Sequence, residues 1–336
     1  MSVKIAINGF GRVGRYITRI LAAEERDIEC VAINSRADSA TQAHLLKYDS
    51  VHGQFALPVD FEEDALIVNG KRIAVSRGIE DLSDLPWGKM GVDIAIEVSG
   101  QFRDRESCAK HLTAGAKKVI LGAPGKGVDV MLVMGINEGS FDPEKHHVIS
   151  DASCTTNCLT PVAKVIHQEF GIKRGLMNTI HSYTMDQRLL DGSHKDLRRA
   201  RAASMSMVPT TSGAARAVGE VMPELAGRMD GLAIRVPTPN VSLVDLTCEL
   251  EKETTVEEVN AALKAASENS LKGILQYSDT PLVSIDYTSS PYSAILDAPL
   301  TKVIGGKTLK VLAWYDNESG FSNRMVDLAH YIGSQL

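Results

Sequence analysis

Short apolar runs separated by amphipathic stretches fill the first 150 residues of this chain. Runs with the length and composition of buried strands are Val3–Asn8, Glu29–Asn34, Asp93–Val98, Lys118–Leu121, Asp129–Gly135 and His147–Ser150. Between some of them the apolar residues recur at helical spacing, as at Val13, Ile17, Ile20 and Leu21 and within Arg105–Ala114. Strands that alternate with helices predict a parallel α/β sheet through about residue 150.

The pattern changes beyond residue 150. Longer runs that suit strands of an α+β domain with a mixed or antiparallel sheet occur at Met177–Ser182, Leu232–Val236, Ser242–Leu250, Leu282–Tyr287 and Thr308–Trp314. Near the end, helical spacing of apolar residues predicts an amphipathic terminal helix that packs on one domain; these residues are Met325, Leu328, Ala329 and Ile332. A length of 336 residues agrees with two domains, at roughly 150 residues each.

The first predicted strand runs directly into a glycine motif. Gly9-Phe10-Gly11-Arg12-Val13-Gly14 fits G-x-G-x-x-G, and a predicted helix follows it. The first glycine permits a tight turn, the second lets the backbone approach a pyrophosphate, and the third lets helix and strand pack closely. A glycine-rich turn that only connects the two elements is the alternative. The context on both sides favours a dinucleotide site at the helix N-terminus.

The end of the second strand bears on the choice of dinucleotide. An NAD site usually has an acidic residue at this point, but here Ser35 is followed by the cationic Arg36. A hydroxyl beside a guanidinium suits the 2′-phosphate of NADP, whereas a carboxylate would repel it. NADP is therefore the preferred cofactor and NAD the alternative. In the NAD case Arg36 is a solvated charge and Asp38 approaches the ribose.

The most informative stretch surrounds Cys154. It follows a predicted strand and precedes an apolar helical run, so Cys154 is expected at or near a helix N-terminus. There the helix dipole and free N–H groups would lower the thiol pKa below its ordinary value and hold an oxyanion. Cys158, one turn later, is interpreted as a small buried apolar residue. A nucleophilic thiol needs a base, and His181 at the end of an apolar strand is the best of nine histidines.

A polar segment after His181 suggests anion binding. It runs from Ser182 to Arg201, and the later Pro209–Gly213 and Arg235–Thr238 also combine hydroxyls with arginines. Arginine forks and hydroxyl donors together bind phosphate groups. Nucleic-acid binding by Lys195–Arg201 is the weaker alternative, because no aromatic residues interleave for base stacking.

Composition narrows the classes of function. The net charge of −6 disfavours a globally basic nucleic-acid binder. Glycines and arginines near the start stand where a signal peptide has its apolar region, and no run approaches the ~18 residues of a membrane span, so a cytoplasmic location is expected. Five cysteines without a CxxC pair argue against a disulfide framework and a zinc site, and no metal is expected.

Three blocks together resemble the phosphorylating glyceraldehyde-3-phosphate dehydrogenase family: INGFGRVGR at the start, ASCTTNC in the middle and WYDNESGFSNR near the end. The resemblance covers the whole length. It implies a Rossmann domain at 1–151, a catalytic domain at 152–318, and a C-terminal helix at about 319–336 that returns to the first. It further implies a homotetramer that catalyses a reversible step of glycolysis or gluconeogenesis.

Carried onto the matching residues, the resemblance implies a covalent mechanism. Cys154 would attack the aldehyde, and His181 would activate the thiol and then act as base while hydride leaves to the nicotinamide. Inorganic phosphate would attack the resulting thioester to give an acyl phosphate. Thr184 and Arg235 would hold the substrate phosphate. The attacking phosphate would meet Ser153, Thr155, Arg199, Ser212 and Gly213.

The resemblance also implies a set of cofactor contacts. Asn317 would orient the nicotinamide amide. The remaining cofactor residues would be Gly9, Phe10, Gly11, Arg12, Val13, Ser35, Arg36, Arg77, Ser99, Gly100, Gly122 and Ser193. Ser35 in place of the usual Asp, and Gly192-Ser193 in place of Leu-Pro, resemble NADP-using members. Gly122 occupies the position of a Ser that is common in the family, and Ser212 occupies that of a Thr. Arg77 is aligned with a family Arg, although its spacing to Trp87 is longer than usual.

Three other functions remain open at this point. Erythrose-4-phosphate dehydrogenase would share Cys154 and His181 but need no phosphate nucleophile. Semialdehyde dehydrogenases and acyl-phosphate reductases use the same chemistry without this combination of motifs. A redox-sensing or RNA-binding module on the same scaffold would keep its main activity after Cys154→Ala.

Overall fold

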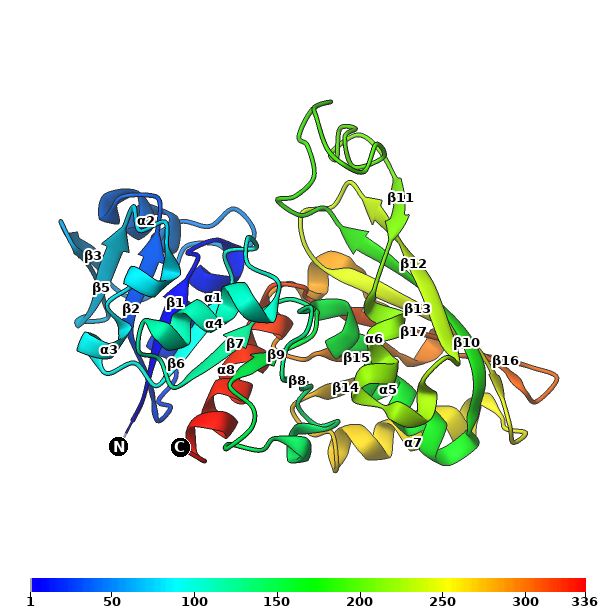
Figure 1. Ribbon diagram of the computed structural model, residues 1–336. Coiled ribbons are helices and arrows are strands. Elements are labelled where there is room, and N and C mark those ends of the chain that lie inside the picture. The colour runs from blue at the N-terminus through cyan, green and yellow to red at the C-terminus, as the bar shows by residue number, and fades with distance from the viewer. Residues whose placement is uncertain (1) are drawn as a thin grey trace. The chain divides into compact units, whose positions relative to one another are not determined.

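The protein is described by a computed structural model covering residues 2–336, and its chain divides into two compact units (Figure 1). The first unit contains the residues through Val133, Glu138–Ala152 and Ser322–Leu336. The second contains Met134–Asn137 and Ser153–Phe321. The chain therefore leaves the first unit just before Ser153 and re-enters it inside the last helix.

A nine-stranded sheet is the frame of the first unit, with strand order β3-β4-β5-β2-β1-β6-β7-β9-β8. The strands are β1 (Val3–Asn8), β2 (Ile28–Ser35), β3 (Val59–Glu62), β4 (Ala65–Val68), β5 (Lys71–Arg77), β6 (Ile94–Glu97), β7 (Lys118–Leu121), β8 (Val130–Met131) and β9 (Val148–Ser150). Every neighbouring pair is parallel except β3–β4 and β4–β5. Because β1 lies between β2 and β6, the carboxyl ends of these three strands meet where an open α/β sheet binds ligands.

Helices cover this sheet with their apolar stripes. They are α1 (Arg12–Ala23), α2 (Ser39–Lys47), α3 (Trp87–Met90), α4 (Arg105–Thr113), the short 3₁₀ turns η1 (Leu82–Asp84) and η2 (Glu138–Ser140), and most of α8 (Ser319–Gly333). In α1 the residues Ile17, Ile20 and Leu21 are buried, as their spacing predicts. In α8 Met325 and Ile332 are fully buried, and Gly333 packs so closely on Val3 that a Cβ there would lie 2.4 Å from a valine methyl.

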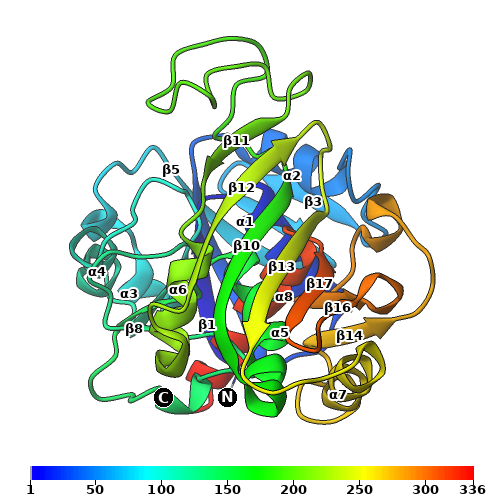
Figure 2. The same cartoon turned by 90° about the vertical axis from the view of Figure 1, so that its right-hand side faces the viewer.

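The second unit contains a mixed eight-stranded sheet, which Figure 2 shows with β12, β10 and β13 side by side. Its strands are β10 (Ile172–Ser182), β11 (Val208–Thr211), β12 (Met229–Val236), β13 (Ser242–Leu250), β14 (Leu275–Ser278), β15 (Ala294–Asp297), β16 (Lys302–Ile304) and β17 (Thr308–Tyr315). Its helices are α5 (Cys154–Phe170), α6 (Ala214–Val221), α7 (Val256–Glu268) and the 3₁₀ turns η3 (Pro223–Leu225), η4 (Ser284–Tyr287) and η5 (Ala298–Leu300). The segment 183–207 between β10 and β11 extends beyond the sheet (Figures 1 and 2).

The predicted fold class, a Rossmann unit plus a catalytic unit with a mixed sheet, is confirmed, with three corrections. Leu282–Tyr287 is wrong as a strand, because Asp286 accepts the N–H of Val283 and closes the 3₁₀ turn η4. Asp129–Gly135 contains only the two-residue strand β8. The three antiparallel strands β3, β4 and β5 were not predicted. Because of them, the first sheet is not wholly parallel.

Candidate active site

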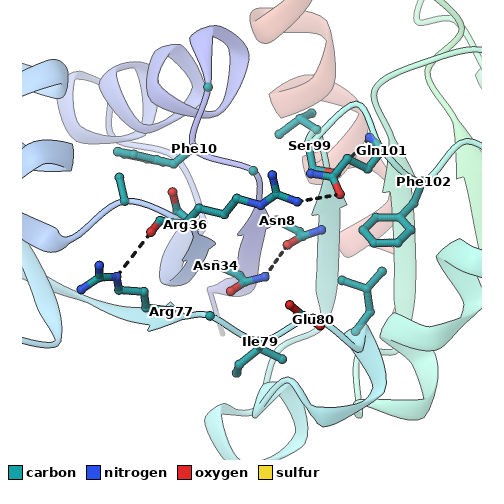
Figure 3. A pocket seen from close by; sticks show the side chains of 17 residues that line it. Asn8, Phe10, Asn34, Arg36, Arg77, Ile79, Glu80, Ser99, Gln101 and Phe102 are labelled. Atoms are coloured by element: carbon teal, nitrogen blue, oxygen red, sulfur yellow. Dashed lines mark hydrogen bonds between the residues drawn. The ribbon is translucent and has the colours of Figure 1, made fainter.

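A cavity of about 980 Å³ opens at the carboxyl ends of the first sheet's central strands (Figure 3). Among the predicted cofactor residues, those that line it are Gly9, Phe10, Gly11, Ser35, Arg36, Arg77 and Ser99. The other lining residues are Asn8, Asn34, Ala37, Gly78, Ile79, Glu80, Leu82, Val98, Gln101 and Phe102. The glycine motif, the end of the second strand and the end of β6 therefore share one cavity wall.

The glycine turn has the geometry that an anion needs. Gly9 has a φ of +100°, which only glycine adopts without strain, and a Cβ on Gly14 would lie 2.3 Å from the carbonyl oxygen of Gly9. The N-cap of α1 is Gly11, and no side chain caps this first turn. A helix start without a side-chain cap suits a pyrophosphate.

Two guanidinium groups approach the outer end of the cavity. Arg36 donates from Nη2 to the Gln101 side chain at 3.3 Å, and Arg77 donates from Nε to the carbonyl of Arg36 at 3.3 Å (Figure 3). Asp38 caps α2 by accepting the N–H of Thr41 at 2.7 Å. One oxygen of its carboxylate is thereby used as the cap of the helix.

Six predicted cofactor residues do not line this cavity; Asn317, in the second unit, is described below. Arg12 pairs with Asp49 from the first turn of α1, and Val13 follows it. Gly100 has a φ of +75° in the loop after β6. Gly122 packs against Val98 and Met325, where a Cβ would lie 2.7 Å from a valine methyl. Ser193 belongs to the second unit, where its carbonyl accepts Nε of Arg188 at 2.8 Å.

Cys154 is the first residue of α5, as its position after a strand predicted. The preceding Ser153 is the N-cap and accepts the N–H of Thr156 at 3.1 Å. The Cys154 Sγ lies 3.6 Å from Nε2 of His181, the second-last residue of β10. A thiol and an imidazole far apart in sequence are therefore in contact within one unit.

The neighbours of His181 bear on its protonation. Nδ1 lies 2.7 Å from the carbonyl oxygen of Ser182 and 3.0 Å from the donor Nη1 of Arg235. We place the ring proton on Nδ1, because the contact with the carbonyl oxygen is the shorter one and Nη1 of Arg235 has two other acceptors. Nε2 then presents its lone pair to Cys154. Burial lowers the pKa of His181 to about 3, and the charge of Arg235 acts in the same direction. The ring is thus a neutral proton acceptor facing the thiol.

The thiol itself differs from the expectation of a lowered pKa. Burial raises the pKa of Cys154 above its ordinary value, against the opposing charge of Arg235 and the hydrogen bond from Thr155. The expectation was wrong because it considered the helix N-terminus and not the desolvation of the site. The resting pair is a neutral thiol beside a neutral imidazole. Cys158 is fully buried, as predicted, and its Sγ lies 3.7 Å from the carbonyl oxygen of Ala313.

Arg235 is the cation closest to this pair. It lies on β12 beside β10, in register with His181. Its Nη1 donates to the carbonyl oxygen of Ser182 at 3.0 Å and to the hydroxyl of Thr184 at 3.1 Å. Its Nε is buried without a hydrogen-bond partner among residues 2–336. A buried guanidinium with an unused donor is ready to bind an anion.

The segment after β10 brings a second arginine into a polar cluster. Arg199 donates to Asp186 at 2.5 Å and to the Thr210 hydroxyl at 3.0 Å. Asp186 also accepts the hydroxyl of Thr184, so one carboxylate joins residues predicted for two different phosphate sites. Nearby in the chain, Gly213 is the N-cap of α6 and Ser212 accepts the N–H of Ala214 at 3.3 Å.

Asn317 is held by two buried hydroxyls. Its Oδ1 accepts from Ser182 at 2.8 Å and from Ser242 at 2.9 Å. Both lone pairs of the oxygen are therefore used, which fixes the amide and leaves its NH₂ group as the available donor. Thr155 bonds the hydroxyl of Tyr315 at 2.9 Å.

Sequence reasoning missed the residues that support this site. Asp186 lies in the polar segment Ser182–Arg201 and Tyr315 in the block WYDNESGFSNR, but neither residue was singled out. Ser242 carries no motif. The roles of all three are recognisable only through their partners. The polar residues Asn8, Asn34 and Glu97 did carry a signal, since each stands at the end of an apolar strand. Among residues 2–336 no group of three metal-ligating side chains exists, and no helix is long and apolar enough to cross a membrane.

Comparisons with known proteins bear on both units. Residues 3–105 match the family model described as the NAD-binding domain of glyceraldehyde 3-phosphate dehydrogenase, and residues 153–317 match that of its C-terminal domain. The fold and these matches define the protein as an oxidoreductase that uses a nicotinamide dinucleotide.

Relatives extend the match to the full length. The chain is 60% identical over 335 residues to glyceraldehyde-3-phosphate dehydrogenase of Geobacillus stearothermophilus, covering 100% of this chain and 99% of the relative. It is 56% identical to glyceraldehyde-3-phosphate dehydrogenase 1 of Bacillus subtilis (100% and 99%) and 52% identical to that of Streptomyces coelicolor (100% of each). The chain belongs to the glyceraldehyde-3-phosphate dehydrogenase family.

Proposed function

We propose that this enzyme catalyses the reversible, phosphorylating oxidation of glyceraldehyde 3-phosphate to 1,3-bisphosphoglycerate, a step of glycolysis or gluconeogenesis. The observation that carries the proposal is the 3.6 Å contact between Cys154 Sγ and Nε2 of His181, with Arg235 beside it. The names of the relatives support the same substrate.

The cavity of the first unit suits a dinucleotide. The positive φ of Gly9, the close approach of Gly14 and the uncapped start of α1 leave room for backbone contact with a pyrophosphate. Gly9, Phe10, Gly11, Ser35, Arg36, Arg77 and Ser99 would line the cofactor site, with Arg12, Val13, Gly100, Gly122 and Ser193 as further contacts. Asn317 would direct its NH₂ group to the nicotinamide amide. Bound nicotinamide supplies the two-electron acceptor of the oxidation.

The Cys154–His181 pair performs the covalent chemistry. As Sγ attacks the aldehyde carbon, its proton moves to Nε2 of His181, which passes it to the former carbonyl oxygen, and a hemithioacetal forms on Cys154. The imidazole, returned to its neutral form, then accepts the hemithioacetal hydroxyl proton as the carbon is oxidised to a thioester. The N–H groups at the start of α5 are in position to stabilise the oxyanion.

Two anion sites complete the reaction. Thr184 and Arg235, already bonded to each other, would hold the phosphate of the substrate. Ser153, Thr155, Arg199, Ser212 and Gly213 would surround inorganic phosphate. A phosphate oxygen attacks the thioester carbon, the carbon–sulfur bond breaks, and the Cys154 sulfur leaves as the acyl phosphate forms.

We further propose that NADP is the preferred dinucleotide. Ser35 carries no charge, and the Arg36 and Arg77 chains lie in the same cavity wall. Asp38, the nearest acid in sequence, is used as the α2 cap. Both features favour a 2′-phosphate over a bare ribose hydroxyl.

The protein is proposed to act as a homotetramer, with the two units serving as cofactor domain (1–151, with helix 319–336) and catalytic domain (152–318). Apolar side chains of the second unit support association. Leu176 on β10 and Leu232 on β12 are 69% and 47% exposed. The segment 183–207 exposes Met185, Leu189, Leu190, Leu197, Met205 and Met207.

One set of initial rates tests the proposal. Glyceraldehyde 3-phosphate is supplied with and without inorganic phosphate, and with NAD and NADP in parallel. Turnover that requires phosphate and is faster with NADP supports both parts. Turnover independent of phosphate, with erythrose 4-phosphate as the better substrate, would replace the assignment by erythrose-4-phosphate dehydrogenase.

A further inference from the structure

Behind the dinucleotide cavity, three neighbouring strands end in polar side chains that bond to one another. Asn8 on β1 is in register with Asn34 on β2 and with Glu97 on β6. Asn8 donates from Nδ2 to Oε2 of Glu97 at 2.5 Å. Its Oδ1 accepts Nδ2 of Asn34 at 2.7 Å, a bond that Figure 3 shows as a dashed line. All three residues are more than nine-tenths buried.

Glu97 accepts four hydrogen bonds, and among residues 2–336 no lysine or arginine donates to it. Besides Asn8, its donors are the backbone N–H of Ser99 at 2.8 Å, the hydroxyl of Ser99 at 2.5 Å and Nε2 of His111 at 3.1 Å. The oxygen of the Ser99 hydroxyl also accepts the N–H of Gln101 at 3.2 Å. Four donors are the bonding pattern of a carboxylate without a proton.

Trp87 fixes the direction of the hydrogen bond between His111 and Glu97. The indole N–H of Trp87 donates to Nδ1 of His111 at 3.0 Å, and an indole nitrogen cannot accept. The imidazole proton therefore resides on Nε2 and faces Glu97. One polarised chain thus runs from Trp87, which is fully buried, to the wall of the cavity.

At the cavity this series of hydrogen bonds fixes the asparagine amides and the backbone of Ser99. Because Glu97 accepts Nδ2 of Asn8, the Asn8 oxygen must face Asn34, and Asn34 in turn leaves its own Oδ1 without a partner. Asn34 lines the cavity, and this unpaired oxygen lies buried in the cavity wall. Glu97 also holds the Ser99 backbone, which the glycine turn abuts: a Cβ on Gly9 would lie 2.4 Å from the Ser99 nitrogen.

We propose that Glu97 is a positioning residue for dinucleotide binding. It orients the Asn8 and Asn34 amides in series and holds the loop after β6 against the glycine turn. It acts through these groups and does not itself line the cavity. This inference rests on the proposal that the cavity of the first unit is the cofactor site.

Glu97→Gln is the informative variant because it preserves size and replaces one acceptor by a donor. If the new NH₂ faces Asn8, both asparagine amides must turn over, and Asn34 then buries an unpaired donor in the cavity wall. The same NH₂ group meets Nε2–H of His111, whose tautomer Trp87 fixes. If it faces Ser99 instead, it meets a backbone N–H. Every orientation leaves buried donors opposed.

The test measures the dissociation constants of NAD and NADP by titration calorimetry on the wild-type enzyme and its variants. We expect Glu97→Gln to weaken binding on the order of ten-fold, the range produced by one opposed buried donor. The cofactor KM should rise in parallel, while kcat at saturating cofactor and the alkylation rate of Cys154 change by less than about three-fold. Val148→Ala in β9 is the matched control, since it removes buried apolar volume from the same sheet and should lower Tm without changing the dissociation constant.

His111→Phe tests the positioning role of Glu97 if the Glu97→Gln variant does not fold. It removes one donor to Glu97 from a residue outside the cavity, and a weakening of about three-fold is expected. Folded variants that bind both dinucleotides as the wild type does would overturn the inference. A weakening of dinucleotide binding equal to that of Val148→Ala would also overturn the inference, since it would show only an effect on stability. Failure of the wild type itself to bind a dinucleotide would instead refute the cavity assignment.

Discussion

The wall of the dinucleotide cavity and the thiol site are both polar and buried, but they use their hydrogen-bonding capacity differently. Around Glu97 the acceptors of the carboxylate are matched by fixed donors. Around Cys154 some of this capacity is unused. Nε of Arg235 and the NH₂ group of Asn317 have no partner among the described residues, and Nε2 of His181 has only the 3.6 Å contact with the thiol.

This difference follows from what each region has to do. A binding surface gains from rigid groups whose orientation is settled before the ligand arrives. A reacting centre needs groups that gain or lose a proton, and burial without a full set of partners shifts their pKa values. His181, with a pKa lowered to about 3, belongs to the second kind.

The largest effect is expected at the thiol. Cys154→Ser should reduce dehydrogenase turnover by roughly 10⁴-fold or more, because no other described group occupies the place of the nucleophile. The control is Cys158→Ala, which lies one turn further along α5 and should keep activity within about three-fold while lowering Tm. Residual turnover of Cys154→Ser near the wild-type value would favour the redox-sensing or RNA-binding alternative.

His181→Asn should lower kcat by roughly 10²- to 10⁴-fold, the range of general base catalysis. The variant removes the acceptor that faces the Cys154 proton, so iodoacetamide should alkylate the thiol more slowly at neutral pH. The measurement is the alkylation rate from pH 5 to 10. A profile that superimposes on the wild type would show that the 3.6 Å contact is not used.

Arg235→Gln should raise the KM for glyceraldehyde 3-phosphate roughly 100-fold, since a charge-assisted contact to phosphate is lost. It also removes a positive charge that lowers the pKa of both Cys154 and His181. Both pKa values should therefore rise, and alkylation of Cys154 should need higher pH. A shift of the alkylation profile to lower pH contradicts this electrostatic account.

Ser35→Asp should reverse the cofactor preference. A carboxylate at the end of β2 repels the 2′-phosphate, so kcat/KM for NADP should fall roughly 10- to 100-fold while that for NAD changes less. Ser35→Ala serves as the control, because it removes the hydroxyl without adding charge. A wild-type enzyme that already prefers NAD would show that Arg36 and Arg77 do not select the phosphate.

The smallest effect is expected at Asp38. Asn is as good an N-cap as Asp, so Asp38→Asn should leave the ratio of kcat/KM for the two dinucleotides unchanged within about two-fold. A change in this ratio in favour of NADP that is much larger than two-fold would show that Asp38 faces the cofactor during turnover. The alternative in which it approaches the ribose would then be correct.

Local sequence patterns predicted the helices and strands that carry the candidate site residues, because each pattern is contained within a few consecutive residues. The glycine motif after β1 and the polar stretch before α5 each combine a strand end with a helix start, and β1, β7 and β13 occur at their predicted bounds. Weak patterns failed: Leu282–Tyr287 has strand composition, but local capping by Asp286 closes a 3₁₀ turn there.

Taken alone, the sequence determined the fold class, the glycine turn and the pairing of a candidate nucleophile with a candidate base, since each depends on residue type and order. Only the tertiary structure decided the protonation of His181, the raised pKa of Cys154 and the part played by Glu97. Those properties depend on burial and on partners 14 to 54 positions away, such as His111 for Glu97 and Arg235 for His181. Folding alone brings such groups within hydrogen-bonding distance and removes the water that would otherwise screen them.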